Sequence, residues 1–389
     1  MMNDTPKLTA NQVQEHAIQG LQAHLPLLAE GYKCTTNDLL NILLAAAVRQ
    51  CTIESACAEL NDGPGAETVR QYLNEQLTIE RLPELEGNLN EALVAQVPKR
   101  LWRHAQEIAI DLHDRPYYGK TSQEEGLWIR SQAKDSTTRF YRIATAYVIH
   151  HGLRVTLALR FYLPTDSIVG VMEMLLERIK ELGIGIKRLL LDKGFASIDV
   201  QIYLQQSRAP ALIACPIRGR TGGTRALCQG NKGYRTTHTF RNAADKKEST
   251  ADVAVCRVFS TAKRTGRMKR RAGWLLFILI NLDLTPRQAR RLYRRRFGVE
   301  TSYRCAGRVR AWTTSPNPAL RFVLIGLSFF LLNLWLHLRW LYTQLPRRGR
   351  RQLDTKLFPL TRFARFISRA VEQHYGCIHE IVAPAVPIP

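Results

Sequence analysis

The chain has 389 residues and a formal net charge of +23 at pH 7, with 56 Lys and Arg against 33 Asp and Glu. This length allows two or three domains, and the excess of positive charge favours a polyanionic partner, usually nucleic acid. The N-terminus is polar, which argues against a signal peptide, and the eight cysteines form no CxxC pair, which argues against a zinc site. We therefore expect a cytoplasmic protein with reduced cysteines.

The first hundred residues differ from the rest because they carry 13 acidic and 7 basic residues. Periodic apolar positions predict helices over residues 8–80, and a turn at residues 61–65 separates two short ones. This break fits a helix-turn-helix DNA reader, but an ordinary helical hairpin fits as well, because Arg70 is the one base on the second short helix. We predict a helical N-terminal domain over residues 1–100 that serves in DNA binding or dimerisation.

From residue 101 onward, strand and helix patterns alternate. The predicted elements are a strand at 107–111, strands at 139–150 and 153–163 joined by a turn at His151-Gly152, a helix at 168–182, a strand at 186–191, a short helix from about Ser197 and a strand at 211–215. This mixed order predicts an α/β core whose first part spans residues 101–215.

Residues 216–284 break this alternation. A loop rich in Gly and Arg, which matches neither a P-loop nor a dinucleotide fingerprint, leads into strand-like segments. We predict a β-rich insertion here. Thr285 and Pro286 then start a long helix, as N-cap and first helical residue. We expect residues 285–345 to complete the core and residues 346–389 to form a basic helical tail.

The segment at 319–340 is apolar enough to resemble a membrane span. Arg321, Asn333, His337 and Arg339 interrupt it, and the uninterrupted apolar run is too short to cross a bilayer. We therefore predict a buried helix of a soluble core and no membrane partner.

Three carboxylates stand out by their positions. Asp111 ends the first core strand, Asp192 ends a later strand, and Glu300 follows the insertion as a lone acid among arginines. Acids at the carboxyl ends of strands open onto the functional edge of an α/β sheet. Together they would form an all-oxygen site for Mg²⁺ or Mn²⁺, and two such ions can activate water and stabilise the leaving oxygen of a phosphodiester.

Each acid also has a structural explanation. An aspartate after a strand often caps a turn, and Asp114 competes with Asp111 as the first ligand. Glu300 could pair with Arg296 or Arg304 on the helix surface. On one continuous helix, Tyr293, Arg296, Glu300 and Arg304 would share a face.

These motifs resemble the DDE transposases of bacterial and archaeal insertion sequences, in the group with a Tyr-x2-Arg-x3-Glu-x6-Lys signature. Tyr293, Arg296 and Glu300 match this signature, and the run from Asp192 through Lys193, Gly194 and Phe195 matches the second acidic motif. Asp111 matches the first aspartate in less distinctive surroundings. The signature lysine falls on Gly307, with Arg308 adjacent. The resemblance covers residues 107–340.

The resemblance implies an RNase H-like mixed-sheet core with a β-rich insertion, flanked by helical regions. It implies a transposase, with endonuclease and strand-transfer activities, in which Asp111, Asp192 and Glu300 hold two Mg²⁺ or Mn²⁺ ions. It implies that Tyr293 and Arg296, the tyrosine and arginine of the signature, contact DNA. We also predict DNA contacts for Lys193, Arg295 and, in place of the lysine, Arg304 or Arg308. The implied partner is double-stranded DNA, bound by a homodimer in a prokaryotic cytoplasm at the nucleoid.

Two other functions fit the same residues. One is an RNase H-like nuclease that cuts DNA without strand transfer. The other is a non-catalytic DNA-binding protein that keeps the fold and the basic surface.

Overall fold

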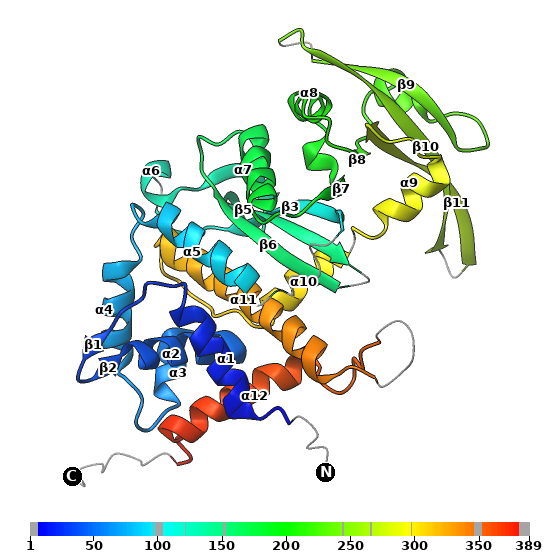
Figure 1. Cartoon of the computed structure of the whole chain (residues 1–389). Helices are drawn as coiled ribbons and strands as arrows, with labels where there is room; N and C mark the ends of the chain where they lie inside the picture. Colours follow the sequence, from blue (N-terminus) through cyan, green and yellow to red (C-terminus); the bar gives the residue numbers. More distant parts are fainter. Residues whose placement is uncertain are drawn as a thin grey trace. The chain divides into compact units, whose positions relative to one another are not determined.

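The computed structural model describes residues 7–95, 97, 104–120, 122–150, 153–242, 245–264, 267–296, 298–345 and 352–380. The chain divides into two compact units (Figure 1). The helical unit comprises Met1–Pro98, Tyr118–Leu127 and Tyr303–Pro389, and the sheet unit comprises Lys99–Tyr117 and Trp128–Ser302. Residues 303–345, which the sequence pattern assigns to the core, group with the N-terminal helices.

The sheet unit is built on one mixed sheet. Within the described residues this sheet has nine strands in the order β4-β5-β3-β7-β8-β11-β10-β9, with β6 also paired to β5. The strands are β3 (Gln106–Pro116), β4 (Ile129–Lys134), β5 (Thr137–His150), β6 (Leu153–Tyr162), β7 (Ile186–Leu191), β8 (Ala211–Cys215), β9 (Tyr234–Arg241), β10 (Glu248–Arg264) and β11 (Arg267–Ile280).

The centre of the sheet has the strand order of an RNase H-like core. β5 runs antiparallel to both β6 and β3, whereas β7 and β8 run parallel to β3. The predicted fold class, an RNase H-like mixed-sheet core with a β-rich insertion and helical flanks, is confirmed. The strands of the predicted hairpin are also confirmed, and its turn at His151-Gly152 lies outside the described residues.

Two helices connect strands of the core, one between β6 and β7 and the other between β7 and β8. They are α7 (Ile168–Glu181) and α8 (Ile198–Gln206), which lie side by side in Figure 1. Ser167 and Ser197 cap them, each accepting a hydrogen bond from the backbone N–H three residues later. The buried side chains of α7 recur at helical spacing, so one face of this helix packs on β5 and β6.

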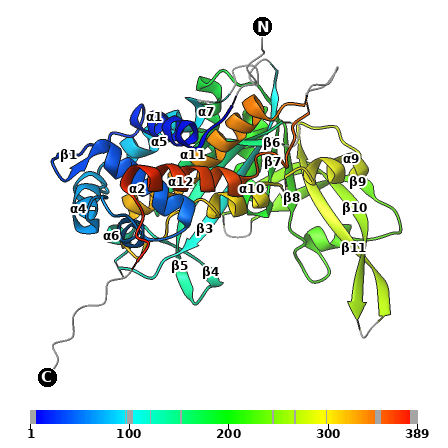
Figure 2. The same cartoon turned by 90° about the horizontal axis from the view of Figure 1, so that it is seen from below.

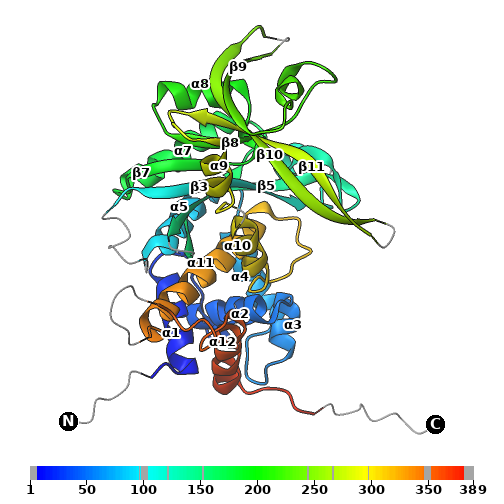
Figure 3. The same ribbon diagram turned by 90° about the vertical axis from the view of Figure 1, so that its right-hand side faces the viewer.

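The insertion extends the core sheet. β11 pairs antiparallel with β8, from Leu276 opposite Cys215 to Ile280 opposite Ala211. β10 and β11 form a long twisted hairpin (Figure 3), and β9 pairs with the outer side of β10. Apolar residues at the base of the hairpin, including Val255 and Ile278, are fully buried. The hydrophobic core therefore continues from the RNase H-like strands into the insertion.

The long helix predicted from Thr285 is broken in the structure. Thr285 and Pro286 start α9 (Pro286–Tyr293) as expected, and a capping box with Gln288 closes its first turn. The chain then turns before α10 (Gly298–Gly307) begins. The prediction of one shared helical face for Tyr293, Arg296, Glu300 and Arg304 is therefore wrong.

Interactions of the turn account for the break. The N–H groups of Arg295 and Arg296 bond to carbonyls three residues back, at 3.0 and 2.9 Å, which is the tighter pattern of a 3₁₀ turn. Arg154 of β6 donates through Nη2 to the Arg295 carbonyl at 3.3 Å. Gly298 permits this approach, because a Cβ there would overlap the Arg154 guanidinium.

The helical unit packs around one long apolar helix. Its elements are α1 (Ala10–Gln22), α2 (Thr36–Arg49), α3 (Ile53–Ala58), α4 (Ala66–Gln76), α5 (Leu82–Ala95), α6 (Gln123–Gly126), α11 (Pro318–Tyr342), α12 (Leu360–Tyr375) and a small sheet of β1 (Glu30–Gly31) and β2 (Cys34–Thr35). Figure 2 shows α12 alongside α1 and α2. Tyr375 of α12 donates to Asp38 of α2 at 2.6 Å, which ties these two helices together.

The apolar segment predicted as a buried helix forms α11. Among the described helices it alone is long and apolar enough to cross a membrane, and 83% of an apolar 18-residue stretch within it is buried. It packs against α5, where Gly326 lies against the side chain of Leu89. Asn333 Nδ2 donates to the Leu93 carbonyl at 2.8 Å, so this interrupting polar residue has a partner inside the unit.

The two short N-terminal helices form as the sequence predicts. α3 and α4 flank the turn at residues 61–65, and α4 begins at Ala66. Arg70, the base on α4, is paired with Glu54 and Glu67. A DNA-reading role for this helix pair stays a prediction.

Candidate active site

The register of two parallel strands brings Asp111 and Asp192 next to each other. Ile110 of β3 is the pairing partner of Leu191 of β7, and this is the last pair between the two strands. The next residue along the chain is an aspartate in both cases, Asp111 within β3 and Asp192 directly after β7. The strand-end pattern in the sequence therefore leads to two adjacent carboxylates, although β3 itself continues to Pro116 beside β5.

Asp111 is a buried carboxylate, with 9% of its surface exposed. Arg296 Nη1 donates to its Oδ1 at 3.2 Å. Burial raises the pKa of the Asp111 carboxyl to about 7, against the opposing effect of the Arg296 guanidinium. The negative charges of Asp192 and Glu300 raise this pKa further. The three acids predicted from the sequence are thus electrostatically linked.

Arg296 and Tyr293 are joined by a hydrogen bond in the interior of the sheet unit. Arg296 is 7% exposed and donates through Nε to the Tyr293 hydroxyl at 3.1 Å. The Tyr293 ring packs on Phe277 of β11, with centroids 4.9 Å apart. The resemblance implies DNA contacts for both side chains, whereas here both are buried and directed at Asp111 or the core. Arg296 is thus the partner of the Asp111 carboxylate, and the Tyr293 hydroxyl supports Arg296.

Asp192 lies where the chain leaves β7 and also caps the short turn that follows. Its Oδ1 accepts a hydrogen bond from the Gly194 N–H at 2.8 Å, and Phe195 anchors the turn in the core. Lys193 is exposed. One carboxylate oxygen therefore has a structural role, and the capping explanation and the ligand explanation are compatible.

Asp114, the competitor of Asp111, has a different partner. Arg142 of β5 donates to both of its carboxylate oxygens, at 2.6 and 2.8 Å. Asp114 lies three residues after Asp111 on the same strand, so the two side chains point to opposite faces of the sheet. This bidentate pair favours Asp111 as the member of the acidic group.

Glu300 is exposed in the first turn of α10. Arg304 is also exposed, on the part of α10 that belongs to the helical unit. Arg308 follows α10 in that unit and lines a pocket of about 240 Å³ together with Arg49 and Arg365. The predicted basic DNA contacts Lys193, Arg295, Arg304 and Arg308 are therefore all exposed, unlike Arg296.

The chemistry of the three acids fits a divalent cation. Carboxylate oxygens are preferred ligands of Mg²⁺ and Mn²⁺, and a cation would offset the burial and the negative neighbours that raise the pKa of Asp111. Among the described residues, no three His, Cys, Asp or Glu side chains lie close enough to share one ion. Arg296 supplies the positive charge beside Asp111 instead.

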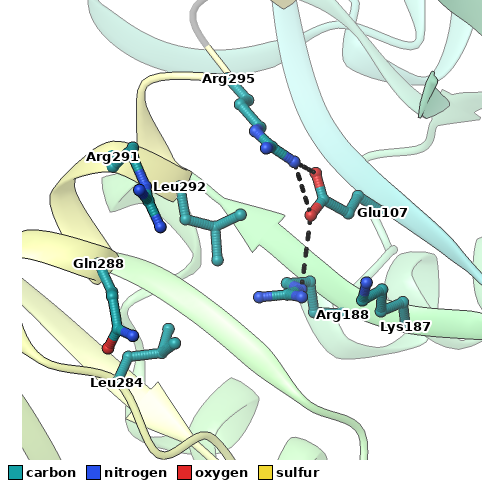
Figure 4. A pocket seen from close by; sticks show the side chains of 8 residues that line it. All are labelled: Glu107, Lys187, Arg188, Leu284, Gln288, Arg291, Leu292 and Arg295. Carbon is teal, nitrogen blue, oxygen red and sulfur yellow. Dashed lines mark hydrogen bonds and ion pairs between the residues drawn. The ribbon is translucent and has the colours of Figure 1, made fainter. Parts of the chain in front are cut away.

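Glu107 is a second buried acid of β3, which the sequence pattern does not single out. Figure 4 shows its carboxylate between Arg295 and Arg188. Arg295 Nη1 donates to both oxygens, at 3.0 and 2.8 Å, and Arg188 Nε lies 3.6 Å from Oε1. The signal in the sequence is its spacing, since residues four apart on a strand share a face.

A known protein family matches more than half of the chain. Residues 102–334 match the model of the family described as Transposase DDE domain. The match spans more than half of the chain, and the chain belongs to this family of DDE transposases. A solved structure, the piggyBac transposase synaptic complex with hairpin DNA, aligns at a TM-score of 0.48 and 10% identity, covering 96% of this chain and 74% of that chain. No curated protein matches the sequence.

Proposed function

We propose that this chain is a transposase of the Tyr-x2-Arg-x3-Glu-x6-Lys group, which cleaves DNA at transposon ends and transfers the freed strand into target DNA. The observation that carries the proposal is the pairing of Ile110 with Leu191, because it leaves Asp111 and Asp192 adjacent. The electrostatic effect of Glu300 on Asp111 supports the third member of the group.

Asp111, Asp192 and Glu300 would hold two Mg²⁺ or Mn²⁺ ions. When bound, such ions lower the pKa of an attacking water or 3′-hydroxyl and stabilise the leaving oxygen of a phosphodiester. The chain's own contribution is to position these carboxylates. Arg296, supported by the Tyr293 hydroxyl, fixes one oxygen of Asp111, and the Gly194 N–H fixes one oxygen of Asp192.

The exposed basic side chains would bind the DNA backbone. Lys193 and Arg295 serve this role in the sheet unit, and Arg304 or Arg308 takes the place of the signature lysine. We expect a homodimer on DNA, because two equivalent ends of one element suit a two-fold symmetric assembly.

The test uses purified protein, Mg²⁺ and a labelled duplex that carries the terminal inverted repeat flanking the coding sequence. We expect a cut at the end of the repeat and joining of the labelled strand to a target plasmid. Cutting without joining would replace the transposase with a nuclease. Binding without cutting by the native protein would indicate a non-catalytic DNA-binding protein.

A further inference from the structure

A basic pocket lies in the sheet unit (Figure 4). It has a volume of about 250 Å³. Its lining comes from the starts of β3 and β7 and from α9 with its flanking turns: Glu107, Lys187, Arg188, Leu284, Gln288, Arg291, Leu292 and Arg295. All these residues belong to one compact unit, so the pocket is formed by a single folded body.

The charges of the pocket are unbalanced. It has four basic side chains and one acidic one. Glu107 is already shared between Arg295 and Arg188. Lys187 and Arg291 are exposed, and their side chains form no hydrogen bond or ion pair with any residue that the structure describes. Two cations therefore remain available for an anionic ligand.

The remaining polar group of the pocket is also a donor. Gln288 accepts the capping hydrogen bonds of Thr285 through Oε1, at 2.8 and 2.9 Å. This leaves its Nε2 group to donate. Guanidinium, ammonium and amide donors around a small concavity match the oxygens of a phosphate.

The pocket lies close to the acidic group along β3. Glu107 and Asp111 are four residues apart on this strand and share a face, a separation of about 13 Å at about 3.3 Å per residue. DNA rises about 3.4 Å per nucleotide of a strand. A DNA strand whose reacting phosphate lies at Asp111 and whose backbone runs along β3 toward Glu107 would place another phosphate at the pocket, a few nucleotides away.

We propose that this pocket binds a backbone phosphate of the DNA, with Lys187 and Arg291 as its principal contacts. The proposal rests on the proposed function for its choice of DNA as the ligand. Glu107 holds Arg188 and Arg295 in place, and Lys187 and Arg291 provide the charge that the ligand neutralises.

The test compares the native protein with the double variant Lys187→Ala/Arg291→Ala and with Arg287→Ala as a matched control. Arg287 is an exposed arginine of the same helix that does not line the pocket. Affinity for a fluorescein-labelled duplex is measured over a salt series without divalent ions. We expect the double variant to lower the slope of log affinity against log salt by up to about two units, and the control to leave it unchanged.

A second measurement locates the phosphate. Duplexes with one uncharged methylphosphonate linkage, moved stepwise away from the cleavage site, should weaken binding by the native protein at one or two positions. The double variant should be insensitive at those positions. Thermal unfolding of the double variant should match that of the native protein, because both side chains are exposed and lack described partners.

The outcomes separate this proposal from the proposed function. If the native protein cleaves and joins DNA but the double variant keeps the native salt slope, the pocket assignment is overturned and the transposase stands. If the native protein does not cleave but the double variant loses slope, the pocket stands and the transposase is overturned. Equal losses in the double variant and in Arg287→Ala would indicate a diffuse basic surface and overturn the pocket.

Discussion

Glu107 and Asp111 lie four residues apart on the same face of β3, and each bonds to one of two consecutive arginines. Glu107 is 8% exposed and Asp111 is 9% exposed, so burial does not distinguish them. Their surroundings do. Glu107 has two arginine partners, whereas Asp111 has one arginine and two carboxylates that act on it.

The two acids therefore differ in how their negative charge is compensated. The charge of Glu107 is compensated by its own unit, so this acid can fasten the turn after α9 to the sheet. The charge of Asp111 is offset in part by Arg296 but repelled by Asp192 and Glu300, and such a group attracts a cation. The same turn holds both arginines, so its conformation determines both environments.

The largest expected effect concerns cleavage. Asp111→Asn and Asp192→Asn should each reduce DNA cleavage by on the order of 1000-fold, since a metal ligand contributes several kcal/mol to the transition state and about 1.4 kcal/mol changes a rate tenfold. EDTA should have a comparable effect on the native protein. Cleavage is followed on the labelled element end in Mg²⁺.

Asp114→Asn is the control for this prediction. Asp114 lies on the same strand but points to the other face and is paired with Arg142. Its replacement should keep cleavage within a few-fold of the native rate. A loss as large as that in Asp111→Asn would make Asp114 the first ligand and remove the contrast with Glu107.

The second effect concerns stability. Glu107→Gln should lower the free energy of unfolding by roughly 1–3 kcal/mol, because the largely buried Arg188 loses its charged partner. Chemical denaturation measures this. Glu248→Gln, which affects an exposed pair with Arg241, should cost about 0–1 kcal/mol. Cleavage by folded Glu107→Gln should persist, and its loss on the scale of Asp192→Asn would assign Glu107 to the reaction.

Much of the sheet could be predicted from the sequence because its strands have strong local patterns. The strand at 186–191 and the strand at 211–215 form with the predicted bounds. The pairing of β11 with β8 could not be predicted, because apolar strand segments do not specify which neighbour they join. Helical periodicity across residues 285–304 likewise conceals the break before Gly298, which depends on Arg154 from a distant strand.

The candidate site, like the sheet, could be predicted in part from the sequence. The strand-end positions of Asp111 and Asp192 and the signature around Glu300 are local features of the sequence. The partner of Arg296 cannot be predicted from local sequence. Helical spacing favours a pair with Glu300, whereas the turn directs the guanidinium to Asp111. The role of Glu107 cannot be predicted from the sequence, because it depends on ion pairs with Arg188 and Arg295 that only the folded structure brings together.

The third effect tests the two arginines directly. Arg295→Ala should reduce the salt slope of DNA affinity by up to about one unit, because this side chain is 57% exposed in the basic pocket although Glu107 offsets part of its charge. Arg296→Ala should leave the slope unchanged, because its guanidinium is buried against Asp111. The salt series used for the pocket measures both. An equal loss of slope in Arg296→Ala would mean that Arg296 leaves Asp111 to contact phosphate when DNA binds.

The smallest effect concerns the turn that carries both arginines. Gly298→Ala places a methyl group against the Arg154 guanidinium and so disrupts its hydrogen bond to the Arg295 carbonyl, whereas alanine by itself favours a helix over glycine by up to about 1 kcal/mol. We therefore expect Gly298→Ala to stabilise the Arg154→Ala protein but not the native one. Chemical denaturation of the four proteins should give a coupling energy of about 1 kcal/mol. Additive effects would show that Arg154 does not hold this turn. The side-chain contacts that position the two arginines would then be those with Glu107, Asp111 and Tyr293.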